Sequence, residues 1–191
     1  MIRGKLIVVS APSGAGKTTI VKAILAKHPS LLFSVSATTR PIRPGEVDGK
    51  DYFFLSRQEF ERRIGIGQLV EWEEIYGNLY GTLRTEVDKA LSAGKTMLFD
   101  IDVKGALSIK QQYPADAVLI FIRPPSIDVL RSRLSNRKTE DEATLTRRLD
   151  RVPMELRMQD HFDFHVVNDD LQTAVGEVEA IIAQHVNIVP P

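Results

Sequence analysis

The sequence predicts an α/β fold in which a parallel sheet is covered by helices on both faces. Short continuous apolar runs, such as 6–10 (LIVVS) and 117–122 (AVLIFI), alternate with amphipathic stretches along the chain. Strands that are apolar on both faces are typical of buried parallel sheets. The chain has 191 residues, which is enough for one domain of this kind and too few for two.

The first half begins with a strand at 6–10 and a helix in which Ile20 and Ile24 recur at helical spacing before Pro29. Short strands are expected at 33–36 (FSVS) and within 51–56 (DYFFLS), and Ser56 is a candidate N-cap for the helix that follows. The region 34–84 is richer in Gly, Tyr and polar residues than its flanks, and we interpret it as an inserted subdomain of mixed strands and loops.

The second half returns to the alternating pattern. Gly94 is a plausible helix terminator before a strand at 96–102 (TMLFDID), and Pro153 should kink or divide a long helical pattern. The remaining expected elements are a helix up to Pro114, the strand 117–122, a helix at 127–137, a strand at 165–168 and a closing helix at 169–186. Lys110, Gln111 and Gln112 are expected to form a solvated helix end, and His161 and His165 are expected to be structural.

Composition excludes several classes of function. Lys+Arg and Asp+Glu both number 25, so the net charge is zero and gives no general attraction to nucleic acid or to a membrane. There is no cysteine for disulfides or thiolate metal sites, and no run approaches the ~18 apolar residues of a membrane span. We therefore expect a soluble cytoplasmic protein without nucleic-acid or membrane partners, whose oligomeric state the sequence does not determine.

A phosphate-binding motif follows the first expected strand. Residues 11–18 fit the pattern G-x-x-x-x-G-K-[ST] at every specified position except the first, where Ala11 replaces glycine. Alanine is acceptable there if its φ is negative, leaving Gly14 and Gly16 to supply the unusual backbone. The alternative is a glycine-rich turn that only caps a helix. The expected ATP-binding residues are Ala11, Pro12, Ser13, Gly14, Ala15, Gly16, Lys17, Thr18 and Thr19.

Within this motif Lys17 is expected to reach the β- and γ-phosphates and Thr18 to bind Mg²⁺. Asp100 ends an apolar strand, the place from which a phosphate-loop enzyme holds hydrated Mg²⁺, and the alternative is that it caps the next helix. Asp102, two residues on, would point to the same side if the strand continued. The fold expected from these features is the P-loop NTPase fold, with Mg²⁺ as cofactor.

Several longer motifs resemble the bacterial-type guanylate kinases. They are SAPSGAGKTT, SVSATTRPIRPGEVDGKDYFF, LVEWEEIYGNLYGT, LFDIDVKGA and HVVNDDL, in that order over nearly the whole chain. The resemblance implies transfer of phosphate from ATP to GMP and, as a second acceptor, dGMP. It implies one domain, with a core of 1–33, 85–125 and 163–191, a GMP-binding subdomain at 34–84 and a short helical lid with adjoining helices at 126–162. Alanine at the first loop position is common in that bacterial branch.

The resemblance also assigns GMP-binding residues. Guanine presents one acceptor, O6, beside the donors N1–H and N2–H₂, so a carboxylate can accept two bonds from it while adenine offers a lone pair instead. Glu71 and Asp102 match the family's carboxylates for this edge, and Ser36 and Thr82 match hydroxyls that donate to O6. The phosphate ligands implied are Arg40, Arg43, Tyr52 and Tyr80. Taken alone, Glu71 is equally readable as a solvent-facing strand carboxylate.

Three arginines match those that close over the triphosphate in the family, namely Arg133, Arg137 and Arg148. The alternative for them is a basic helix surface. Where many relatives have Gly-Arg-Gly, this chain has Asn136-Arg137-Lys138, which should stiffen the loop. Asn168 matches a segment near the adenine, although it is equally readable as a strand-end turn.

Two other functions compete with GMP phosphorylation. Guanylate-kinase-like modules that bind phosphorylated peptides have lost the phosphate loop, whereas this chain keeps Lys17, Thr18 and Asp100. A phosphate-loop kinase of a phosphorylated sugar would not need Glu71 and Asp102, because its acceptor has no guanine edge.

Overall fold

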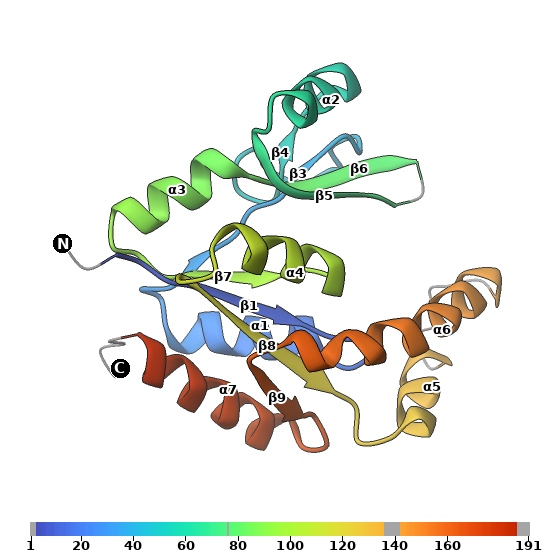
Figure 1. Cartoon of the computed structure of the whole chain (residues 1–191). Coiled ribbons are helices and arrows are strands. Elements are labelled where there is room, and N and C mark those ends of the chain that lie inside the picture. Colours follow the sequence, from blue (N-terminus) through green and yellow to red (C-terminus); the bar gives the residue numbers. More distant parts are fainter. Residues whose placement is uncertain (1–2, 76, 136–141, 187–191) are drawn as a thin grey trace.

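A computed structural model describes residues 3–75, 77–135 and 142–186, with only the backbone for 135 and 142–148. Its larger sheet has five strands in the order β2-β7-β1-β8-β9, all of them parallel where they pair (Figure 1). The strands are β1 Leu6–Ser10, β2 Leu32–Phe33, β7 Met97–Asp100, β8 Ala117–Arg123 and β9 Phe164–Val167. The parallel sheet predicted from the apolar runs is confirmed.

The three central strands, β7, β1 and β8, are buried on both faces because their side chains alternate between two apolar clusters. Ile7 and Val9 of β1 belong to one cluster, and Leu6 and Val8 belong to the other. Helices α1 (Lys17–Lys27) and α7 (Leu171–His185) contribute to the first cluster, and α3 (Arg84–Ser92) and α4 (Val103–Gln112) to the second. Each fully buried aliphatic side chain contributes roughly 1.5–3 kcal/mol relative to an exposed one, so the two clusters fix the position of the sheet's carboxyl edge.

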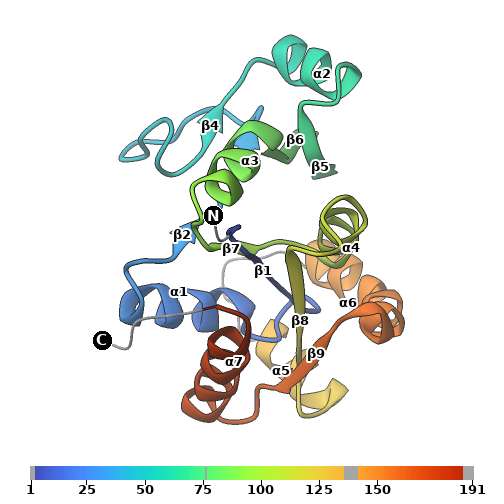
Figure 2. The same cartoon turned by 60° about the vertical axis from the view of Figure 1, so that its left-hand side comes forward.

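The smaller sheet takes all its strands from residues 37–83, in the order β4-β3-β6-β5. Its strands are β3 Ala37–Thr38, β4 Phe53–Phe54, β5 Leu69–Ile75 and β6 Asn78–Leu83. Helix α2 (Arg57–Gly65) buries Phe60 against it, and Ser56 caps that helix by accepting from the Glu59 amide, as predicted. The sheet and α2 form a lobe above the five-stranded sheet in both views (Figure 1, Figure 2).

The chain crosses between the two sheets twice. The first crossing corrects the strand predicted at 33–36, because residues 32–33 pair with β7 while 37–38 already pair with β4 and β6. At the second, Arg84 donates to the carbonyls of Gly67 and Leu69 and to the side chains of Gln112 and Tyr113. Gln112 also donates to the Val70 carbonyl. Gln111 and Gln112 are exposed, as predicted for a solvated helix end, and Gln112 in addition ties α4 to the smaller sheet.

The described residues between β8 and β9 form α5 Ile127–Ser135, α6 Glu142–Arg157 and the short 3-10 segment η1 Met158–His161. Helix α6 runs through Pro153 without interruption, so Pro153 does not divide the helix, and the alternative of a kink there stays a prediction. Proline removes one amide donor, and the hydrogen bonds of the neighbouring turns are enough to keep the helix continuous. In the described part of the chain no helix is both long and apolar enough to cross a membrane.

Candidate active site

The phosphate loop lies between β1 and α1, as the motif predicts. Gly14 and Gly16 have φ values of 90° and 93°, in the left-handed region that favours glycine. Space requires glycine as well, because a Cβ on Gly14 would lie 2.8 Å from the Leu134 side chain, and one on Gly16 would lie 2.3 Å from Asn168 Nδ2. These two glycines therefore supply the unusual backbone of the loop.

Ala11, at the first position of the motif, is only 6% exposed and belongs to the same apolar cluster as Val9, Ala15 and Ile20. Its methyl group therefore packs beneath the loop, which gives a physical reason for alanine at this position. A negative φ at Ala11 stays a prediction.

Helix α1 starts at Lys17, and its N-cap Gly16 has no side chain to satisfy the first amides. Free amides at a helix start, together with the helix dipole, favour an anion there. The Lys17 ammonium lies 2.8 Å from Asp100 Oδ1 and donates to the Ile101 carbonyl. The loop thus brings one cation and one carboxylate to the carboxyl edge of the sheet, where β1 and β7 lie side by side.

The oxygens at this edge suit a magnesium ion that arrives with a nucleotide. Thr18 offers a hydroxyl in the first turn of α1, and Asp100 offers a carboxylate at the end of β7. Mg²⁺ bound to nucleotides takes one or two protein oxygens and fills the rest of its shell with phosphate and water. The described residues contain no group of three or more His, Cys, Asp or Glu side chains that would hold a metal alone. The Thr18 hydroxyl and the Asp100 carboxylate fit the one or two protein oxygens that a nucleotide-borne Mg²⁺ takes.

Asn168 lies beneath the loop. Its side chain is buried, at 6% exposure, and its amide donates to the Ala15 carbonyl with 2.7 Å between the atoms. Arg133, on α5, donates to the Asn168 carbonyl. This part of the predicted ATP site therefore supports the loop from below. Of the other lid arginines, Arg137 lies outside the described residues, and Arg148 lies in α6 with its side chain outside the described part.

Two carboxylates meet at the start of α4. Thr82 on β6 donates to Glu71 on β5, with 2.6 Å between the oxygens. A Cβ on Gly105 would lie 3.1 Å from both Glu71 Oε2 and Asp102 Oδ1, so the two acidic side chains converge on the same point above this glycine. Burial, with Asp102 and Glu73 nearby, raises the pKa of Glu71 to about 7 even though the Thr82 hydrogen bond lowers it.

Asp102 lies beyond the strand, because β7 ends at Asp100. It is the N-cap of α4 and accepts from the Gly105 amide with 2.7 Å between the atoms. The capping role considered for Asp100 therefore belongs to Asp102, and strand alternation does not set its direction. Asp102 nevertheless reaches Glu71, because the cap holds its carboxylate over the first turn of α4.

The predicted phosphate ligands gather around a residue that the sequence did not single out. Arg40 donates from two nitrogens to both oxygens of Glu46, at 3.1 and 2.7 Å, and the Arg43 amide donates to the same carboxylate. The Arg40 guanidinium also lies 5.3 Å from the centre of the Tyr52 ring, which packs edge-on against Tyr80. Arg40 holds the pKa of Glu46 below its usual value. Of the remaining predicted ligands, Ser36 is half-buried just before β3, and its carbonyl accepts from Phe53.

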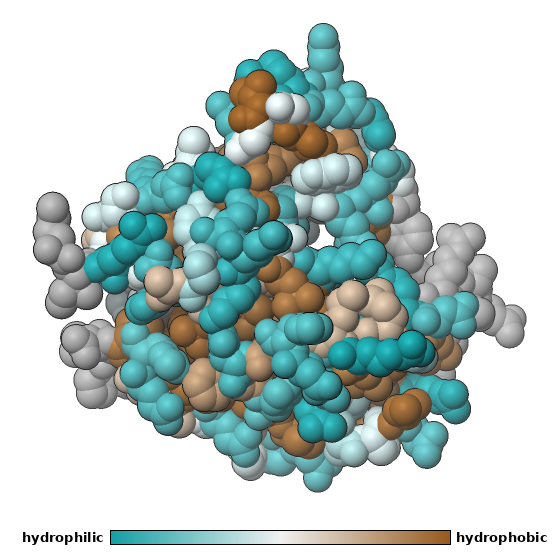
Figure 3. All heavy atoms as spheres, viewed as in Figure 1, coloured by the Kyte–Doolittle hydropathy of each residue, from teal (hydrophilic) through white to brown (hydrophobic). Residues whose placement is uncertain are grey.

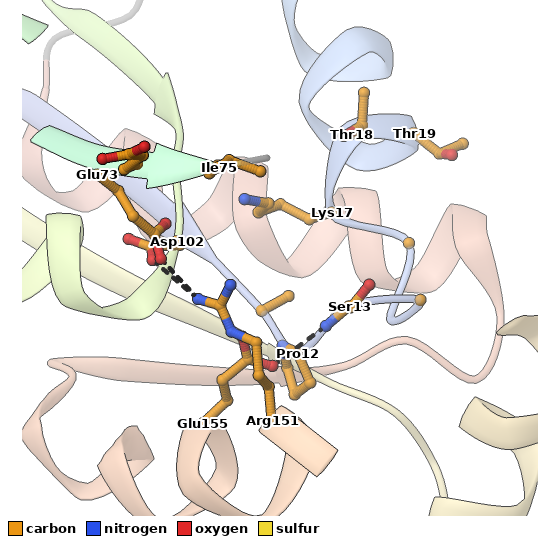
Figure 4. A pocket seen from close by; sticks show the side chains of 14 residues that line it. Pro12, Ser13, Lys17, Thr18, Thr19, Glu73, Ile75, Asp102, Arg151 and Glu155 are labelled. Carbon is orange, nitrogen blue, oxygen red and sulfur yellow. Dashed lines mark hydrogen bonds and ion pairs between the residues drawn. The ribbon is translucent and has the colours of Figure 1, made fainter. Parts of the chain in front are cut away.

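A cavity of about 480 Å³ joins the phosphate loop to the smaller sheet. Lys17 and Pro12 line it on one side and Glu73, Ile75 and Asp102 on the other, with Arg151 and Glu155 of α6 between them (Figure 4). In the space-filling view a hollow opens between the upper lobe and the core, with hydrophilic residues around it (Figure 3). Glu73, Arg151 and Glu155 were not predicted from the sequence, although the acidic residues within 71–74 were a signal for Glu73.

The parallel sheet, the phosphate loop and the second sheet across the cavity define the class of phosphate-loop nucleotide kinases. The family model described as guanylate kinase matches residues 3–185, so the chain belongs to the guanylate kinase family. The resemblance carried by its motifs is thereby confirmed.

Individual relatives agree with the family assignment. The chain is 50% identical to the guanylate kinase of Symbiobacterium thermophilum over 180 residues, covering 94% of this chain and 85% of the relative. It is 50% identical to that of Chlorobium luteolum over 175 residues, covering 92% and 89%. The crystal structure of guanylate kinase from Anaplasma phagocytophilum matches with a TM-score of 0.74 at 30% identity, covering 96% of this chain and 87% of that one.

Proposed function

We propose that this chain transfers the γ-phosphoryl group of ATP to GMP, giving ADP and GDP, and that it accepts dGMP as well. The observation that carries the proposal is that one cavity joins the phosphate loop to Asp102, the N-cap of α4 that converges with Glu71: Lys17 and Asp102 both line this cavity. The proposed contacts read the base and the phosphate of the acceptor, and none of them requires the 2′-hydroxyl.

The converging carboxylates select the base. Glu71 accepts from guanine N1–H and N2–H₂, and Asp102 accepts the second N2 hydrogen. Ser36 and Thr82 donate to O6; the single Thr82 hydrogen points to Glu71 in this structure, so the hydroxyl turns when the base binds. Adenine leaves these buried groups unpaired, a mismatch that can reduce specificity constants by up to ~10⁴.

The acceptor phosphate binds between Arg40, Arg43, Tyr52 and Tyr80. A guanidinium matches two phosphate oxygens at once, and Arg40 already makes such a paired contact with the Glu46 carboxylate. The phosphate therefore replaces Glu46 on Arg40.

The reaction needs no general base, because the attacking phosphate oxygen is ionised near neutral pH, its second pKa being about 6. Alignment and charge neutralisation lower the barrier. Lys17 and the arginines Arg133, Arg137 and Arg148 neutralise the charge that develops on the transferring group, and the lid excludes water. Thr18 and Asp100 would hold Mg²⁺, which would further neutralise the phosphates when it is bound with ATP.

A coupled assay with ATP and Mg²⁺ tests the proposal against GMP, dGMP, AMP, UMP and ribose 1,5-bisphosphate. GMP and dGMP should be turned over at least 100-fold more efficiently than the other acceptors. Absence of GMP turnover would contradict the proposal, and preferred use of the sugar phosphate would support the other kinase class.

A further inference from the structure

Arg151 lies among acidic side chains from three elements. Its Nη2 atom lies 3.0 Å from Glu73 Oε1 on β5 and 3.5 Å from Asp102 Oδ2 at the start of α4. Its Nε atom lies 3.8 Å from Glu155 Oε1, one turn further along α6. The guanidinium points across the cavity toward Asp102 (Figure 4). Arg151 of α6 thus pairs both with the smaller sheet, through Glu73, and with Asp102, the carboxylate proposed to bind the base.

The contact with Arg151 constrains the orientation of the Asp102 carboxylate. Its Oδ1 atom accepts from the Gly105 amide and lies on the side where Glu71 converges. Its Oδ2 atom faces Arg151. Two carboxylates that converge on one point repel each other, and this repulsion favours turning Asp102 away from Glu71. The Arg151 contact opposes that turn by attracting the outer oxygen.

We propose that Arg151 is a positioning residue that holds Asp102 ready to accept the 2-amino group of guanine, and that it thereby favours GMP over IMP. The inference rests on the proposed function and concerns one edge of the acceptor base. Hypoxanthine, the base of IMP, keeps O6 and N1–H but lacks the 2-amino group. A substitution that acts through Asp102 therefore weakens the binding of GMP and leaves the binding of IMP nearly unchanged.

The charged groups around this contact decide which variants are informative. Glu71 and Glu73 face it from β5, Asp102 from α4, Glu155 from α6, and Lys17, paired with Asp100, faces Glu155 from α1. Arg151→Met keeps the length of the side chain and removes its charge, whereas Arg151→Lys keeps the charge. Arg157→Met, at an exposed position of the same helix, is the matched control for loss of a positive charge.

The experiment measures kcat and KM for GMP and IMP in the full chain, with inhibition constants for IMP if its turnover is too slow. Arg151→Met should raise KM for GMP about tenfold, the order expected for one lost hydrogen bond, while kcat and the IMP constants change less than about twofold. Arg151→Lys should recover part of the loss, and Arg157→Met should match the wild type. Asp102→Asn should lose the same preference, and adding Arg151→Met to it should cost little more.

Equal losses for GMP and IMP would overturn the proposal, because they would place Arg151 on the phosphates or in the stability of the fold. Unchanged constants for both nucleotides would overturn it too. A wild-type chain that does not phosphorylate GMP would instead contradict the proposed function itself, before any variant is compared.

Discussion

The Thr82 hydroxyl donates to the Glu71 carboxylate across the β5–β6 pair, and the two oxygens are 2.6 Å apart. This hydrogen bond favours the ionised form of a carboxyl group whose pKa burial raises to about 7. In the proposed complex a protonated Glu71 could not accept from both guanine donors, so this hydrogen bond would extend the pH range in which GMP binds.

Replacing Thr82 tests this link. Thr82→Val removes the donor and should raise the pKa of Glu71 further, so KM for GMP should rise about three- to tenfold at pH 7, and by less at pH 8.5. Thr82→Ser keeps the hydroxyl and should stay within about twofold of the wild type. Profiles of kcat/KM against pH would show the shift, and a Val variant with an unmoved profile would contradict it.

The raised pKa of Glu71 also predicts how the stability of the fold depends on pH. Because its folded-state pKa of about 7 exceeds the ordinary value of 4.5, the folded chain holds an extra proton between these values, and the stability from Glu71 is lost as pH rises through about 7. Glu71→Gln does not ionise. Relative to this variant, the melting temperature of the ligand-free wild type should therefore fall between pH 5 and pH 8. A constant difference across that range would refute the prediction.

The Glu71→Gln variant should also lose the preference for GMP over AMP.

Replacing Lys17 should separate the effect on kcat from the effect on GMP binding. Lys17→Met should reduce kcat at least 100-fold, because the ammonium at the phosphate loop is lost, while GMP binding by calorimetry should change less than about threefold. The melting temperature should fall as well, since Asp100 loses its partner at 2.8 Å. An equal loss of GMP affinity would show that the donor and acceptor sites are misassigned.

Arg84 connects the smaller sheet to the end of α4 in the core, so replacing it should lower the stability of the fold. Arg84→Met removes donors to two carbonyls and two side chains at the second crossing, so the free energy of unfolding should fall by about 1–3 kcal/mol. Arg62→Met is the matched control, because Arg62 is 53% exposed and pairs with Glu59 one turn away on the same helix. It should cost less than about 1 kcal/mol. Denaturant unfolding of both variants measures the difference, and equal losses would contradict the joining role.

The central strands β1, β7 and β8 were predictable because each is a continuous run of mostly buried apolar residues. The phosphate loop was predictable because its glycines and lysine follow a fixed spacing. Boundaries were less predictable. The strand predicted at 96–102 ends at Asp100, since Asp102 satisfies an amide of the next helix and so leaves the strand. Sequence patterns do not show which of two nearby aspartates caps a helix.

Contacts across the cavity were not predictable. Glu73 and Arg151 are 78 residues apart and come from different layers, so no periodicity links them. Glu46 was overlooked because a carboxylate in a polar loop is usually solvated. Only the fold shows that the Arg40 side chain and the Arg43 amide both turn toward it.

Glu46 gives the acceptor pocket a resident anion. In the proposed complex the phosphate of GMP would replace Glu46 on Arg40, so Arg40 would exchange one negative partner for another. A nucleoside without phosphate could not make this exchange, so the proposed pocket would select for charge as well as for the base.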